Sequence, residues 1–173
     1  MAINVSIVED NEQLRGTLAR LIGRTEGFAC VGQHATAEAA LKNVPLEKPH
    51  VVLMDINLPG ISGVECVRKL KQLLPAMQVM MLTAYEDTDN IFNALKAGAN
   101  GYMLKRTSRA ELLEAIREVH RGGSPMTAHI ARKVVQSFQQ SADSVQQTED
   151  LSPREREVLD CLAQGFLYKE IAD

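Results

Sequence analysis

The sequence lacks the features of membrane-spanning, disulfide-bonded and base-stacking proteins. Its longest uninterrupted apolar runs, such as 51–54 and 79–82, have four residues, whereas about 20 are needed to span a bilayer. No basic segment followed by an apolar one opens the chain, so no secretion signal is predicted. Three scattered cysteines form no disulfide framework. A chain without tryptophan and with 4% aromatic residues has little to stack on single-stranded nucleic acid. These absences predict a cytoplasmic protein that does not enter membranes.

The composition is that of a globular protein. Of the 173 residues, 45% are hydrophobic and 24% are charged, which allows one ordinary domain, or one domain with a fragment of a second. The formal net charge is -3, so the chain as a whole has no basic surface for phosphate backbones. We therefore expect a packed core and little non-specific affinity for nucleic acid.

Five short apolar segments alternate with five segments of helical periodicity. Strands are expected at 3–8, 28–33, 51–54, 79–82 and 101–104, and helices around 14–22, 37–44, 64–74, 91–95 and 112–119. Ser62 with Glu65, and Ser108 with Glu111, form capping boxes at two helix starts. Strands that are apolar on both faces, each followed by a helix, predict a parallel sheet covered on both sides. Five units are too few for an eight-stranded barrel, so the expected fold is a doubly wound five-stranded α/β sandwich.

The alternation breaks at the Gly-Gly-Ser-Pro sequence of residues 122–125. Beyond it, Ile130, Val134 and Phe138 recur at helical spacing and predict one further helix. Residues 139–150 are polar and predict a flexible linker. The predicted division is a first domain at 1–121, a linker helix with flexible linker at 122–150, and a partial all-α segment at 151–173.

Five polar side chains directly follow predicted strands: Glu9, Asp10, Asp55, Thr83 and Lys105. Taken singly, each has an ordinary structural explanation, as a helix cap, a turn former, a β-branched strand end or a solvated lysine. In an open parallel sheet, however, ligands bind beyond the carboxyl ends of the strands. Their occurrence together at four strand ends therefore favours a functional site.

Three neighbouring carboxylates repel one another unless a cation neutralises them. Oxygen ligands without histidine or cysteine suit Mg²⁺. A divalent ion beside a lysine makes a place for a phosphoryl group, and a carboxylate there can be the nucleophile. The residues thus point to Mg²⁺-dependent phosphoryl transfer onto a carboxylate.

Over residues 2–121 the sequence resembles the receiver domain of two-component response regulators, which has a flavodoxin-like fold. The matching motifs are the acidic pair Glu9-Asp10, the run 51–60 around Asp55, Thr83-Ala84, and the Gly-Tyr-Met-Leu-Lys sequence that ends at Lys105. Arg106 departs from the pattern, because many receivers have a proline there, and this argues against the cis peptide bond of those relatives.

The resemblance implies a role for each residue of this set. Asp55 would accept a phosphoryl group from a sensor histidine kinase. Asp10, Asp55 and the backbone carbonyl of Asn57 would hold Mg²⁺, with Glu9 helping through water. Lys105 would hold a phosphoryl oxygen. Thr83 would hydrogen-bond the arriving group, and Tyr102 would be the aromatic switch that turns inward when Thr83 moves.

Residues 151–173 resemble the start of a LuxR-type helix-turn-helix domain, through the sequences 151–159 and 168–173. With the receiver, this implies a transcriptional regulator of the NarL/LuxR family, in which phosphorylation controls dimerisation and promoter binding of the full-length protein. The recognition helix would follow residue 173, and residues 125–173 contain five basic against eight acidic side chains. This chain is therefore expected not to bind promoter DNA itself.

Two other functions are compatible with parts of this pattern. A hydrolase or transferase of the haloacid-dehalogenase class also uses a Mg²⁺-bound aspartate, but it needs an acid two residues after the nucleophile, where this chain has Asn57. A stand-alone receiver that acts by protein contact or as a phosphate sink is the remaining alternative. The regulator that we favour would catalyse only its own phosphorylation and slow dephosphorylation. We expect it to dimerise through the face formed by the last strand and the helices on either side of it.

Overall fold

The computed structural model describes the backbone of residues 2–147 and the side chains of residues 2–138. Its elements are β1 (Ile3–Val8), α1 (Glu12–Arg24), β2 (Phe28–His34), α2 (Ala37–Glu47), β3 (Val51–Met54), α3 (Gly63–Leu73), β4 (Gln78–Thr83), α4 (Thr88–Lys96), β5 (Gly101–Leu104), α5 (Arg109–His120) and α6 (Ala128–Gln147). The predicted α/β fold is thereby confirmed. The helix-turn-helix segment predicted at 151–173 lies outside the described residues.

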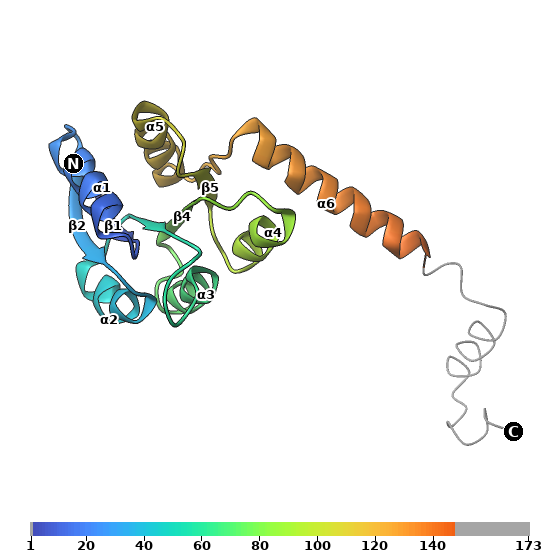
Figure 1. The fold of residues 1–173 in the computed structure, drawn as a ribbon, viewed down its shortest axis with the longest axis horizontal. Coiled ribbons are helices and arrows are strands. Elements are labelled where there is room, and N and C mark those ends of the chain that lie inside the picture. The colour runs from blue at the N-terminus through green and yellow to red at the C-terminus, as the bar shows by residue number, and fades with distance from the viewer. Residues whose placement is uncertain (1, 148–173) are drawn as a thin grey trace, which may run out of the picture. The chain divides into compact units, whose positions relative to one another are not determined.

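The five strands form one parallel sheet in the order β2-β1-β3-β4-β5 (Figure 1). The chain passes from β1 outward to β2 and then returns across β1 to β3. The carboxyl ends of β1 and β3 therefore flank the point where the strand order reverses, which is where ligands bind in such sheets.

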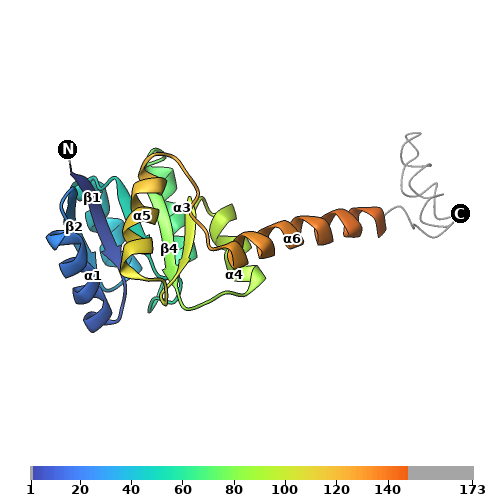
Figure 2. The ribbon, with the colours of Figure 1, turned by 90° about the horizontal axis from the view of Figure 1, so that it is seen from above.

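Helices cover both faces of the sheet. Figures 1 and 2 show α1 and α5 on one face and α2, α3 and α4 on the other. Each layer has its own apolar core, with Leu18, Ile22 and Ile116 in the first and Val44, Val67 and Leu70 in the second. All four residues of β3 are buried, as expected for a central strand with helices on both sides. Burial of such side chains contributes about 1.5–3 kcal/mol each.

Helix caps show which polar residues the fold itself uses. Asn11, not Asp10, is the N-cap of α1, and its side chain accepts a hydrogen bond from the Leu14 N–H. Asp10 is therefore not used in capping. The capping box predicted for Ser108 is present at α5. At α3 only half of the predicted box forms, because Ser62 caps the helix while Glu65 pairs with Arg68 along it.

Residues 124–134, here called the edge segment, pack along β5 although the sequence predicted a linker there. The Tyr102 N–H donates to the Pro125 carbonyl at 3.0 Å, and Tyr102 forms a parallel bridge with Met126. Gly101 permits the approach, since a Cβ there would lie 3.0 Å from the Pro125 ring. Ile130 is fully buried in the core shared with α4. The first compact unit therefore extends to Val134.

The helix predicted from Ile130 is α6, and it is longer than expected. It continues to Gln147, through residues that the sequence predicted to be flexible. Residues 128–147 contain neither glycine nor proline, so no residue in this stretch forces the helix to end.

Replacing Ile130 by Ala is expected to lower the free energy of unfolding of the receiver unit by about 2–4 kcal/mol, because it leaves a cavity in a packed core. Thermal or urea unfolding followed by circular dichroism measures the change. Arg132→Ala, which alters an exposed neighbour on the same helix, is the matched control. Equal stability of the two variants would show that the edge segment is not anchored by Ile130.

In the part of the chain that the structure describes, we find no helix both long and apolar enough to cross a membrane.

Candidate functional site

Three of the predicted site residues meet through one ammonium group. The Lys105 Nζ atom lies 2.8 Å from Asp55 Oδ2 and 2.8 Å from Glu9 Oε2. The two carboxylates are 3–4% exposed and the lysine side chain is 23% exposed. Lys105 is thus a shared counter-charge for two buried acids, and it is not an ordinary solvated lysine on the surface.

The third acid completes a cluster. Carboxylate oxygens of Glu9, Asp10 and Asp55 all lie within 4.8 Å of one another. Asp10 is exposed, unlike the other two, so the cluster opens to solvent on its side. Such a compact set of oxygens fits Mg²⁺, which prefers carboxylates and retains several waters. Among the side chains of residues 2–138 this is the one group of three such residues with that spacing.

Backbone hydrogen bonds extend the sheet just past the strands and fix where these side chains begin. The Asp55 N–H donates to the Val8 carbonyl at 3.0 Å, and the Lys105 N–H donates to the Thr83 carbonyl at 2.9 Å. Glu9, Asp10, Asp55 and Lys105 are each the first or second residue after a strand, and Thr83 is the last residue of β4. The parallel register alone therefore places them at the same edge.

The loop after Asp55 returns closely onto the site. The Asp55 Oδ1 atom accepts a hydrogen bond from the Ile56 N–H at 2.8 Å, and the Gly63 N–H donates to the Ile56 carbonyl at 2.8 Å. A Cβ on Gly63 would overlap the Asp55 carbonyl oxygen, so only glycine lets α3 begin here. Asn57 lies exposed in this loop.

Burial and the ion pairs with Lys105 have opposite effects on the pKa values of the site residues. Burial raises the pKa of Glu9, and the nearby Asp55 charge raises it further, although the Lys105 hydrogen bond offsets part of the rise. Burial by itself would lower the pKa of Lys105, but its hydrogen bonds to Asp55 and Glu9 outweigh burial and raise the pKa. Lys105 therefore stays protonated, and it can neutralise only one of the three acids.

The two predicted switch residues are buried beside the β4–α4 loop. The Thr83 Oγ1 atom accepts a hydrogen bond from the Tyr85 N–H at 3.4 Å. The Tyr102 ring is fully buried, and its hydroxyl donates to the Tyr85 carbonyl at 2.9 Å. Burial raises the pKa of Tyr102, so the hydroxyl remains a donor. The structure thus holds Tyr102 inward, while its movement with Thr83 stays a prediction.

Two supporting contacts were not predicted from the sequence. Arg15 of α1 donates from Nη1 to the Glu9 carbonyl at 2.6 Å and to the Asp10 carbonyl at 3.2 Å, which ties down the acidic loop. Arg106, which replaces the usual proline, pairs with Glu86 of the β4–α4 loop at 2.8 Å. The described residues contain no cis peptide bond, as the departure at Arg106 suggested. A basic residue about one turn into a helix is too common a pattern to have revealed Arg15.

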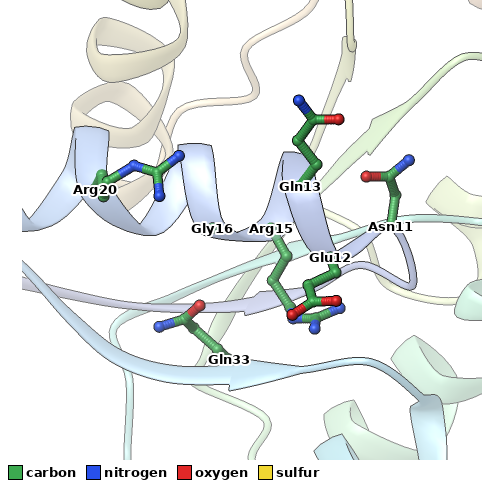
Figure 3. Close-up of a pocket in the computed structure, with 7 residues that line it drawn as sticks. All are labelled: Asn11, Glu12, Gln13, Arg15, Gly16, Arg20 and Gln33. Carbon is green, nitrogen blue, oxygen red and sulfur yellow. The ribbon is translucent and has the colours of Figure 1, made fainter.

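Two other polar features lie nearby without belonging to this cluster. An open depression of about 690 Å³ lies along α1 and is lined by residues that include Arg15, Arg20 and Gln33, but by none of the three acids of the cluster (Figure 3). In the interior, Glu47 accepts a hydrogen bond from the Ser6 hydroxyl at 2.7 Å and lies 3.1 Å from His34 Nε2. Both partners of Glu47 are satisfied by the same carboxylate, which is typical of a structural network.

The arrangement can hold a divalent cation and present an anionic oxygen to an electrophile. Asp55 is anchored on one oxygen by a backbone N–H and on the other by Lys105, so its carboxylate has a defined orientation. The cluster lacks histidine and cysteine, so Mg²⁺ or a similar hard cation fits the donors better than zinc.

Known proteins resemble this chain in sequence and in fold. A protein-family model described as the response regulator receiver domain matches residues 5–117. The response regulator protein VraR of Staphylococcus epidermidis is 31% identical over 172 residues, which cover 99% of this chain and 81% of that protein. The DNA-binding transcriptional activator DevR/DosR of Mycobacterium tuberculosis is 30% identical over 171 residues, covering 99% of this chain and 79% of that protein.

Solved structures agree. The crystal structure of a two-component response regulator of the LuxR family from Aurantimonas sp. superimposes with a TM-score of 0.75 at 30% identity, and the alignment covers 80% of this chain and 99% of that chain.

Proposed function

Since this chain belongs to the two-component response regulators of the NarL/LuxR family, we propose that its receiver domain accepts a phosphoryl group on Asp55 and thereby controls transcription. The observation that carries the proposal is the Lys105 ammonium, 2.8 Å from both Asp55 and Glu9, beside a cluster of three acids. An ordinary ion pair sets one carboxylate against one ammonium, whereas here the single Lys105 ammonium stands against three carboxylates.

In the proposed reaction, an Asp55 oxygen forms a bond to phosphorus while the bond from phosphorus to the donor atom breaks. A phosphohistidine of a sensor kinase would be the donor, and its imidazole leaves as the neutral ring after taking up a proton. Asp10, Asp55 and the Asn57 carbonyl would hold Mg²⁺, with Glu9 acting through water. When bound, the ion neutralises charge on the phosphoryl oxygens. Lys105 would pass from Asp55 to a phosphoryl oxygen, and Thr83 would donate to another.

The output is proposed to be promoter binding by the full-length protein as a dimer in the cytoplasm. The relative from Mycobacterium tuberculosis is named a DNA-binding transcriptional activator, and residues 151–173 resemble the beginning of a helix-turn-helix. The proposed division is a receiver at 1–121, a linker at 122–150, of which residues 124–134 pack on the receiver, and the partial effector at 151–173. Apart from its own phosphorylation and slow dephosphorylation, no reaction is proposed for it.

The edge segment gives this output a physical route within the receiver unit. The hydroxyls of Thr83 and Tyr102 are both hydrogen-bonded to the backbone of Tyr85. The next residue, Glu86, pairs with Arg106, and its carbonyl accepts a hydrogen bond from Lys133 of α6 at 2.5 Å. A shift of Thr83 toward a phosphoryl group would therefore displace the loop that anchors the start of α6.

The direct test is phosphorylation by a small phosphodonor in the presence of Mg²⁺, followed by mass spectrometry. We expect the addition of one phosphoryl group, located on the peptide that contains Asp55. An unmodified protein, or a phosphoryl group on another residue, would contradict the assignment.

Thr83→Ala is expected to leave Asp55 reactive while weakening the coupling of phosphorylation to dimerisation by about three- to ten-fold, the effect of one lost hydrogen bond. Light scattering with and without phosphodonor gives the coupling, and mass spectrometry of the same sample gives the phosphorylated fraction. Equal coupling in wild type and variant would refute a switch through Thr83.

A further inference from the structure

The β3–α3 loop, residues 56–62, has to be held in place if it is to serve the site. It follows Asp55 directly and carries Asn57. Within the loop, the Leu58 N–H donates to the Ile56 carbonyl at 3.2 Å, and both of these side chains are 7% exposed. These contacts fix the side of the loop nearest Asp55. The far side, which contains Gly60 and Ile61, is exposed or half-buried and needs another anchor.

Glu38, in the first turn of α2, provides that anchor. Its Oε1 atom accepts a hydrogen bond from the Ile61 N–H at 3.1 Å, across 23 residues of sequence. The loop turns beside the Glu38 carboxylate at Gly60, which has a φ of +77°. A Cβ at Gly60 would lie 2.6 Å from the same Glu38 oxygen. The absence of a side chain at this position thus both permits the turn and leaves room for the carboxylate.

The Glu38 carboxylate is an ionised acceptor under ordinary conditions. Hydrogen bonds from its own backbone N–H and from that of Ile61 lower its pKa, and the hydroxyl of Thr36 and the charge of Lys69 act in the same direction. Hydrogen bonds to an ionised acceptor are stronger than those to a neutral one. Exposure to solvent reduces the gain, so an effect of several-fold is expected rather than of several orders of magnitude.

We propose that Glu38 is a positioning residue for the phosphorylation site, because it holds the β3–α3 loop in the conformation in which the Asn57 carbonyl can serve as a metal ligand. The inference rests on the proposed function of Asp55, but it concerns a residue of another helix. Glu38 touches neither the acidic cluster nor a reacting atom. It acts through the Ile61 N–H and the Gly60 turn.

Hydrogen exchange of the Ile61 amide in the metal-free protein tests the anchor itself. Glu38→Ala should accelerate this exchange by about ten-fold relative to wild type, because the amide loses its acceptor. Glu38→Gln, which keeps a neutral acceptor, should give an intermediate rate. Glu114→Ala, which removes an exposed acid paired only within α5, is the matched control and should not change it. Wild-type exchange at Ile61 in Glu38→Ala would overturn the proposal.

Magnesium affinity tests the consequence for the site. We expect Glu38→Ala to raise the Mg²⁺ concentration for half-maximal binding, followed by the amide chemical shifts of Asp55 and Asn57, by about five-fold, as for one lost hydrogen bond at a solvent-exposed position. The Mg²⁺ concentration for half-maximal phosphorylation should rise equally, while the rate at saturating Mg²⁺ stays within about two-fold of wild type. Glu38→Gln should restore most of the affinity.

Gly60→Ala is the complementary variant, since it disturbs the same contact from the loop side. It should weaken Mg²⁺ binding at least as much as Glu38→Ala does, because a Cβ at Gly60 both crowds the Glu38 carboxylate and strains the turn. Adding Glu38→Ala to this variant should cost little more, because the contact is already lost. Unchanged Mg²⁺ affinity in Glu38→Ala, or fully additive losses, would overturn the proposal. A wild-type protein that binds Mg²⁺ but takes up no phosphoryl group would instead refute the proposed function, while the exchange and affinity measurements would still decide the role of Glu38.

Discussion

Asp55→Asn is expected to abolish phosphorylation, with a rate at least about a hundred-fold below wild type, equivalent to about 2.7 kcal/mol in the barrier. Asparagine has nearly the same shape as aspartate, and its single amide oxygen can still accept a hydrogen bond from the Ile56 N–H. Its NH2 group then takes the place of the oxygen that faces Lys105. The asparagine side chain offers no anionic oxygen to attack phosphorus. The loss is therefore chemical and not a consequence of misfolding.

The fold of this variant provides an internal check. In the wild-type protein Asp55 and Glu9 share the Lys105 ammonium. The substitution therefore removes a repulsion between two buried acids and should leave the thermal stability equal or higher. Asp89→Asn, which neutralises an exposed acid of α4, is the control and should be phosphorylated normally. Phosphoryl incorporation into Asp55→Asn at the wild-type level would refute Asp55 as the acceptor.

Removal of Mg²⁺ by excess chelator is expected to reduce phosphorylation by about a hundred-fold or more. Lys105 supplies one positive charge against three carboxylates, and an arriving phosphoryl group adds further negative charge. Without a second cation this charge is not neutralised in the transition state. Added Mg²⁺ in excess of the chelator should restore the rate, which excludes irreversible damage to the protein.

Asp10→Asn should have a similar effect, since Asp10 is the exposed member of the cluster and is not needed as a helix cap. Mg²⁺ should also stabilise the wild-type protein against unfolding, by about 2.7 kcal/mol at 100 times its dissociation constant. Asp10→Asn should lose most of this stabilisation. Undiminished phosphorylation in excess chelator, or equal stabilisation of the variant by Mg²⁺, would contradict the metal role.

The sequence alone was sufficient for the sheet and for the residues at its edge. Apolar residues recur along the strands and helices of the receiver with the regular spacing of each element. The parallel sheet follows from strands that are apolar on both faces, such as 51–54. Once the strands are parallel, their carboxyl ends must lie together. Glu9, Asp55 and Lys105 are therefore brought to one edge by topology, without any knowledge of their contacts.

Tertiary structure alone decided which residues support that edge. The contacts of Glu38 with Ile61, of Arg15 with the acidic loop and of Glu86 with Lys133 join residues that no periodic pattern relates. The same holds for the edge segment, where the spacing of Ile130 and Val134 predicted a helix but did not indicate that Ile130 would be buried in the receiver core. Periodicity reports which face of an element is apolar, but the partner of a polar side chain depends on how elements distant in sequence approach one another.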